Sequence, residues 1–383
     1  MKKRIPSLLV TAAILAGCSS DKKAENAADK VTVFSSMGGT YEKGLIYCFD
    51  PIDQPTRFLD YASLETTPLC AMPNCTHITS TCLAKQVGVN PIMYGEHIYY
   101  FQSNHGYEET ADGHQFFMKT TLWKANLETS ETEVVAEFND CVPDEWNSDH
   151  VLIGNTLWFI GNDMNYSSED VMDDSWKPSS DTPGAHFMCS IDLETGEYNN
   201  YGSVSDAYLE SPYWSSGNSA KLKGVYKGKL QIEIQYNLGA QQNGYDYFND
   251  DPDEYFEFRN VEFDMVTKTA AETDRFFPVN VGENYYIGAD LKPNGVSDLY
   301  VLYDGNEFVI EDEDFNVFVL NGKLFTLTSE NWYDLTDFSE HPIPEVLKEN
   351  GFIRAAYHDG SYIFLNNKHE PVSLTEDELL ALE

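Results

Sequence analysis

A repeat runs along most of the length of this chain and limits the folds that it can adopt. Seven times, a glycine or polar turn is followed by a short run rich in aromatic and β-branched residues, which is typical of a β-strand. The glycines that open these runs lie roughly 40 to 70 residues apart, a spacing at which repeat architectures are expected. The runs are Gly44–Phe49, Gly95–Phe101, Gly154–Ile160, Gly228–Ile234, Gly282–Ile287, Gly322–Leu327 and Gly360–Leu365.

A second unit usually follows the first. It consists of a strand, a short turn rich in Asp, Thr and Gly, and another strand, as in Leu122–Val135 and Met188–Tyr198. Two hairpins per period would form a four-stranded antiparallel sheet, and such sheets at periods near 40–50 residues indicate β-propeller blades. The pattern resembles the TolB-like propellers of extracytoplasmic bacterial proteins, and that resemblance implies an all-β propeller domain over residues 32–374.

The ends of the repeat decide the expected number of blades. We predict six, with the ring closed by pairing an N-terminal segment, Gly44–Leu59, with a C-terminal one, Phe352–Asn366, in one composite blade. Seven blades result if Pro371–Leu374 instead continue a blade of their own. A two-sheet sandwich is the alternative, although it explains the repeated turns less well. The five other blades are expected at 90–140, 150–204, 210–272, 276–312 and 313–346, and residues 375–383 are expected to form a short helix or tail.

The first 20 residues indicate export and attachment to a membrane. Lys2, Lys3 and Arg4 precede an apolar stretch that is too short to span a bilayer as a helix. The following Leu15-Ala16-Gly17-Cys18 resembles the lipobox of bacterial lipoproteins. That resemblance implies a signal peptide over 1–17, a lipid such as palmitate on Cys18, a flexible tether over 18–31, and a place on the outer face of the cell membrane. An ordinary cleaved secretory signal is the alternative.

The charge of the chain limits its partners. The net charge of −39 becomes −42 when the three basic residues of the signal are removed. A protein this acidic repels polyanions, which argues against nucleic acid as a partner and leaves neutral glycans or envelope proteins. Hydrophobic residues make up 42% of the chain, enough for a large core.

A cysteine-rich stretch is the most unusual chemical feature. Cys70, Cys75, His77 and Cys82 offer three thiolates and an imidazole, a ligand set that zinc accepts in tetrahedral structural sites. The spacing is not that of two ordinary zinc knuckles, and a Cys-x-His pair leaves little slack for two bonds to one ion. Disulfides are the alternative outside the cytoplasm, because six cysteines remain once Cys18 is lipidated and they allow 15 pairings. Unpaired thiols, as in an anaerobe that keeps them reduced, are the third alternative. For a metal site or a disulfide we expect a structural role.

Aromatic residues in three long insertions are the predicted ligand-binding residues. Such insertions form loops, and aromatic rings beside Asp and Asn suit sugar rings. These residues are Trp176, Tyr213, Trp214, Tyr245 and Tyr247.

The motifs of common hydrolases and nucleotide-binding enzymes are missing from the sequence, so no catalytic residues are assigned. We therefore favour a non-catalytic binding or scaffold module for a glycan or envelope protein. A glycan-active hydrolase or lyase on the same scaffold is the alternative, and a subunit of a membrane-bound complex is a third option.

Overall fold

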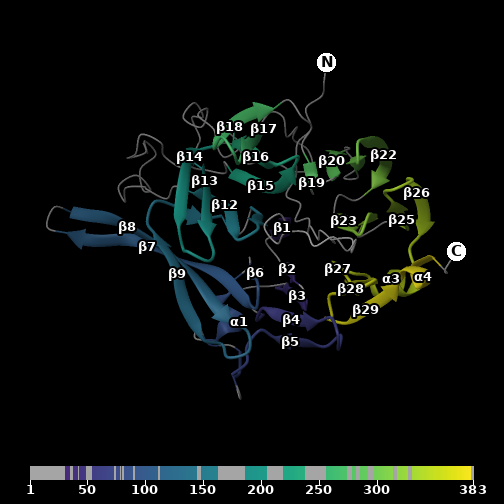
Figure 1. Ribbon diagram of the computed structural model, residues 1–383, viewed down its shortest axis with the longest axis horizontal. Helices are drawn as coiled ribbons and strands as arrows, with labels where there is room; N and C mark the ends of the chain where they lie inside the picture. Colours follow the sequence, from purple (N-terminus) through teal and green to yellow (C-terminus); the bar gives the residue numbers. More distant parts are fainter. Residues whose placement is uncertain are drawn as a thin grey trace, which may run out of the picture.

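The computed structural model shows a β-propeller of seven blades in a ring (Figure 1). Consecutive strands within each blade pair antiparallel, and blades 4 and 5 are joined at their inner strands by one parallel contact, Gly224 with Val281. The part of the chain that the structure describes comprises residues 31–34, 38–41, 43–48, 54–72, 75–77, 79, 82–88, 91–110, 113–144, 148–162, 186–204, 219–237, 256–273, 278–281, 285–291, 297–313, 317–326 and 330–380.

The first three blades occupy the N-terminal half of the chain. Blade 1 consists of β2 (Gly38–Tyr41), β3 (Gly44–Tyr47), β4 (Arg57–Asp60) and β5 (Thr66–Pro68). Blade 2 consists of β6 (Ile92–Tyr94), β7 (His97–Thr110), β8 (Gly113–Asn126) and β9 (Thr132–Phe138). Blade 3 consists of β11 (His150–Ile153), β12 (Thr156–Asn162), β13 (His186–Asp192) and β14 (Tyr198–Ser203), with β10 (Val142–Pro143) paired to β12.

The remaining four blades follow in order around the ring. Blade 4 consists of β15 (Ser219–Tyr226), β16 (Lys229–Asn237), β17 (Phe256–Asp264) and β18 (Thr269–Thr273). Blade 5 consists of β19 (Pro278–Val281), β20 (Tyr285–Leu291), β21 (Ser297–Tyr303) and β22 (Asn306–Glu313). Blade 6 consists of β23 (Val317–Leu320), β24 (Lys323–Thr326), β25 (Asn331–Asp334) and β26 (Ser339–Pro342), and blade 7 of β27 (Arg354–His358), β28 (Ser361–Leu365) and β29 (Pro371–Thr375).

The recurring hairpins form because their turns carry the right polar residue. In each of three blades, an Asp or Asn at the end of a strand accepts hydrogen bonds from the backbone N–H groups two and three residues further on. This side-chain turn reverses the chain without help from distant residues. The residues are Asn126, Asp192 and Asp264. Blades 2 to 6 accordingly fall close to the five ranges predicted from the repeat.

The structure has seven blades, which is the alternative prediction and not the expected six. Gly44–Leu59 and Phe352–Asn366 do not share a composite sheet, because each belongs to a blade of its own. Blade 1 has an inner strand, β2, that pairs with β3. Blade 7 is continued by β29, in which Pro371–Thr375 pair with β28. The closure predicted from the two ends was therefore wrong in its pairing, although these two segments do lie in neighbouring blades.

Packing, not a shared sheet, closes the ring between blades 1 and 7. Leu45 and Leu59 of blade 1 belong to the same buried cluster as Tyr362 and Phe364 of blade 7 and side chains of blade 6. The ring of Tyr61 stacks on that of His358, with 4.7 Å between the ring centroids. Two further clusters join blades 1 to 3 and blades 3 to 6, so every neighbouring pair of blades shares a hydrophobic core.

One strand lies outside the sequential order. β1 (Val31–Phe34) pairs with β11 at the inner edge of blade 3, near the middle of the ring, and brings this sheet to six strands (Figure 1). It begins at Val31, one residue before the expected start of the propeller. The chain therefore contributes to blade 3 first and only then forms blade 1.

The helices in the described part of the chain are short and lie between or after blades. They are α1 (Leu83–Gln86), α3 (Glu345–Asn350) and α4 (Glu376–Leu380). Thr375 and Glu378 exchange the reciprocal hydrogen bonds of a capping box at the start of α4. Lys323 of blade 6 reaches both Glu376 and Asp334, at 2.9 and 3.1 Å, which holds this helix on the ring. Within the described residues, no helix has the length and apolar character needed to cross a membrane.

A buried histidine between blades 2 and 3 predicts a pH dependence of stability. His150 is 0% exposed and packs against the rings of Phe101 and Phe159. Burial lowers the pKa of its imidazole from 6.5 to about 3. Between these two values the unfolded chain holds a proton on His150 that the folded chain does not, so stability falls as the pH falls. The unfolding equilibrium constant should rise up to about tenfold per pH unit from this group.

His150→Phe removes the titrating group and keeps an aromatic ring of similar size. We expect urea unfolding of the unaltered chain to become easier between pH 6.5 and 4 by a larger margin than unfolding of His150→Phe. Equal pH slopes for the two proteins would show that His150 is not buried in its neutral form.

Candidate metal centre

The predicted ligand residues lie in the connection between blades 1 and 2, from the end of β5 to α1. Thr56 anchors this connection. Its backbone N–H donates to the carbonyl of Ala84 at 2.8 Å, and its carbonyl accepts from the N–H of Leu69 at 2.9 Å. The side chains of Leu69, Leu83 and Val87 are buried in the core shared by blades 1 to 3. Both ends of the segment are therefore held by the propeller.

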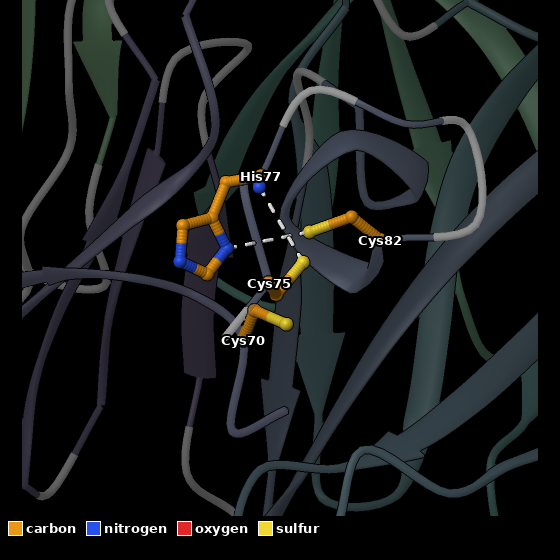
Figure 2. A group of neighbouring side chains, drawn as sticks. All are labelled: Cys70, Cys75, His77 and Cys82. Atoms are coloured by element: carbon orange, nitrogen blue, oxygen red, sulfur yellow. Dashed lines mark hydrogen bonds between the residues drawn. The ribbon is translucent and has the colours of Figure 1, made fainter. Parts of the chain in front are cut away.

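The structure brings all four predicted ligands together. The three Sγ atoms of Cys70, Cys75 and Cys82 and a ring nitrogen of His77 all lie within 4.8 Å of one another. Figure 2 shows the four side chains converging from separate parts of the connection. With Zn–S bonds of about 2.3 Å, the edges of a tetrahedral site measure about 3.8 Å between two sulfurs and about 3.6 Å between sulfur and nitrogen. The observed group is thus only slightly more open than a zinc tetrahedron.

Local backbone geometry explains how closely spaced ligands reach one point. His77 adopts a left-handed conformation with φ of 58°, which His tolerates better than most residues. Its backbone N–H donates to Cys75 Sγ at 3.4 Å, while its Nδ1 lies 3.5 Å from Cys82 Sγ (Figure 2). The sharp turn at His77 removes the objection that a Cys-x-His pair lacks slack. Cys82 is placed independently, as the residue before the first turn of α1.

The thiols of Cys75 and Cys82 have pKa values shifted in opposite directions. The hydrogen bond from the His77 backbone N–H lowers the pKa of the Cys75 thiol, which favours the thiolate that metals bind. Burial raises the pKa of the Cys82 thiol to about 12. Cys82 is fully buried, whereas Cys70, Cys75 and His77 are half-buried. An ion would therefore enter from the half-buried side and would displace the proton of Cys82 as it binds.

The disulfide alternative is less well supported for these residues. A disulfide would join only two of the three sulfurs and leave the imidazole without a role, whereas a metal ion uses all four groups. One contact beside the ligands was not predicted from the sequence. The backbone N–H of Ala71 donates to Ser130 Oγ at 3.1 Å and so holds the loop that carries Cys70. This hydrogen bond joins the connection between blades 1 and 2 to the β8–β9 turn of blade 2. No local pattern in the sequence predicts it.

The other predicted functional residues lie outside the described part of the chain. These are the lipid-bearing Cys18 and the aromatic residues Trp176, Tyr213, Trp214, Tyr245 and Tyr247. Their roles stay predictions.

Comparisons with known proteins add a fold-level likeness. No protein-family model matches the chain, and neither does any curated protein. Among solved structures, it is similar to an acylaminoacyl peptidase from Pyrococcus horikoshii, at 12% identity and a TM-score of 0.42, over 92% of this chain and 52% of that one. It is also similar to an oligogalacturonate lyase from Vibrio parahaemolyticus (10% identity, TM-score 0.35, 90% of each chain) and to TolB from Acinetobacter baumannii (9% identity, TM-score 0.24, 98% of this chain and 96% of that one).

The chain spans about half the length of the peptidase. At these identities and scores we assign no activity, substrate or partner from the three proteins.

Proposed function

We propose that this chain is a lipid-anchored, extracytoplasmic β-propeller that acts as a non-catalytic binding or scaffold module for a glycan or envelope protein. In this proposal Cys18 carries the lipid, and the segment up to the first strand is the tether. Cys70, Cys75, His77 and Cys82 hold a structural zinc ion that fixes the connection between blades 1 and 2.

The observation that carries the proposal is the completeness of the ligand set. If all four residues bind one zinc ion, they would fill its tetrahedral coordination and leave no position for water or substrate. Catalytic zinc sites keep such a position open. The best-defined chemical group in the described residues therefore suits the maintenance of a rigid scaffold better than turnover of a substrate.

The position of the site explains why an ion would be useful there. In the described residues of the connection from β5 to β6, α1 is the one helix, and the backbone N–H groups of Cys70, Cys75 and Cys82 donate to carbonyls only two or three residues earlier. One ion bound to Cys70 at one end and to Cys82 at the other would restrain the intervening loop. The blade faces and their loops then remain available for a partner.

Metal analysis tests the zinc part of the proposal. The full-length chain, extracted from membranes in detergent and dialysed, should contain one equivalent of zinc by inductively coupled plasma mass spectrometry. Cys75→Ser and His77→Ala should each lose most of it. A folded wild-type chain that takes up no zinc when the ion is supplied would overturn this part.

Fractionation and binding assays test the remaining parts. Cys18→Ala should move the chain from the membrane to the soluble fraction. A panel of neutral polysaccharides and of peptidoglycan should then be tested for retention of the protein and for release of new reducing ends or unsaturated products. Retention without products supports a binding module. Product release would instead support the alternative, a glycan-active hydrolase or lyase.

Two substitutions locate the binding face. Trp176→Ala and Trp214→Ala should reduce retention on a bound glycan at least tenfold, because stacking on an aromatic ring is lost. Tyr300→Ala is the matched control, since this tyrosine of blade 5 is 39% exposed and lies outside the predicted loops. Equal retention by all three variants would exclude these loops as the binding site.

A further inference from the structure

A second group of cysteines lies in blade 3, away from the metal centre. Cys141 directly precedes β10, and Cys189 lies within β13. Both side chains are 0% exposed, and their Sγ atoms are 3.7 Å apart. This separation is van der Waals contact between two sulfurs, although the residues are far apart in the sequence.

A glycine makes the contact between the sulfurs feasible. β12 runs between β10 and β13, and Gly161 of β12 pairs with Pro143 on one side and Phe187 on the other. A Cβ atom at Gly161 would overlap the Cys141 side chain and would lie 3.3 Å from Cys189 Sγ. The missing side chain thus provides the space in which the two thiols meet across the central strand.

A tyrosine completes the group. The hydroxyl oxygen of Tyr198 lies 3.3 Å from Cys141 Sγ and 3.5 Å from Cys189 Sγ. This hydroxyl donates its hydrogen to Asp140 Oδ1 at 2.8 Å, so its oxygen is left to accept from the thiols. Burial raises the pKa of the Cys189 thiol well above its usual range, which keeps it protonated at neutral pH. In the reduced state the two thiols therefore share one hydrogen-bonding partner, the Tyr198 hydroxyl.

We propose that Cys141 and Cys189 are a disulfide-forming pair that staples the passage from blade 2 to blade 3. Each sulfur loses a proton and an electron as the S–S bond forms, and an external disulfide compound takes up both and is reduced to two thiols. The sulfurs must approach from 3.7 Å to about 2.05 Å as the bond forms. Because both thiols are buried in the folded chain, exchange occurs while blade 3 folds.

The position of the bond gives it a structural effect. Cys141 lies in the connection that leaves β9, the outermost strand of blade 2, and enters blade 3. A bond to β13 attaches this connection to the middle of the next blade. Apart from Cys18, the six cysteines of the chain then divide into three metal ligands, one disulfide pair and Cys48, a buried residue of blade 1 that lies near the Arg354 guanidinium.

Peptide mapping tests the pairing. The full-length chain is unfolded, reduced, and refolded with zinc present in a mixture of oxidised and reduced glutathione. Remaining thiols are then alkylated in denaturant before proteolysis and mass spectrometry. We expect one linked peptide pair joining Cys141 to Cys189, lighter by about 2 Da than the two reduced peptides together. Recovery of both cysteines in alkylated form, or a bond from either one to Cys48, would overturn the proposal.

Variants separate the bond from other effects on folding. Cys141→Ala and Cys189→Ala should each abolish the linked peptide, whereas the matched control Cys48→Ala should retain it. In the presence of zinc, a phosphine reductant should lower the urea midpoint of the wild-type chain and leave that of the Cys141→Ala, Cys189→Ala double variant unchanged. An equal drop in both would contradict a stabilising bond. If a variant does not fold, the peptide map of the wild-type chain still decides the pairing.

Discussion

Replacement of Cys82 by serine is expected to abolish zinc binding and to remove about 4 kcal/mol from the free energy of unfolding, when free zinc exceeds its dissociation constant about a thousandfold. Cys82 is the fully buried ligand and is also the residue that leads into α1, so its loss disconnects the ion from the core shared by blades 1 to 3. The measurement is urea unfolding of each protein with saturating zinc and with a zinc chelator.

Comparison of the two conditions within each protein isolates the contribution of the ion. The wild-type chain should lose stability when the chelator is added, and Cys82→Ser should not respond. Cys48→Ser is the matched control, because it places the same hydroxyl at another buried cysteine, outside the ligand group. It should keep the full zinc-dependent increment. If Cys82→Ser still gains stability from zinc, the four residues do not form the binding site.

A second large effect is expected from Gly44→Ala, at the glycine that opens the first repeat. A Cβ atom here would overlap the backbone carbonyl oxygen of Leu59 and the ring of Phe58. The carbonyl belongs to β4, which is paired with β3, so it cannot move without disturbing the sheet. We expect a loss of about 3 kcal/mol, at the upper end of the usual cost of overpacking.

The glycine that opens the second repeat provides the control for this substitution. Gly95 has φ of 60° and open space where a Cβ atom would lie. Gly95→Ala should therefore cost only the strain of the left-handed conformation, about 1 kcal/mol. Thermal and urea unfolding of the two variants should rank them in this order. A Gly44→Ala protein as stable as Gly95→Ala would mean that β3 and β4 pack more loosely than the structure shows.

These two glycines also illustrate what could be predicted from the sequence. Each repeat is defined by residues that act locally, such as a glycine at a turn or Asp192, whose side chain accepts hydrogen bonds from the backbone of its own turn. Blades 2 to 6 could therefore be placed from local patterns alone. The number of blades could not. It depends on whether Pro371–Thr375 pair with β28. No local pattern in the sequence of Pro371–Thr375 shows which strand this segment will pair with.

The two groups of cysteines likewise differ in how much of their arrangement could be predicted from the sequence. The closeness of Cys70, Cys75, His77 and Cys82 in the sequence indicated a group although their spacing is unusual, but only the three-dimensional arrangement favours a metal ion over disulfides for them. Cys141 and Cys189 meet across Gly161 because of strand order within blade 3. Their contact, like the pairing of β1 with β11, joins residues with no local signal that they will be neighbours.

The pairing of β1 with β11 determines how the molecule responds to force. A pull applied upstream of Val31 enters the ring at blade 3, where Val31–Phe34 pair with His150–Ile153, and not at the seam between blades 1 and 7. Four residue pairs carry that load before any other strand does. The mechanical weak point of a tethered propeller would thus lie near its axis, and tension would extract the innermost strand while the surrounding blades stay assembled.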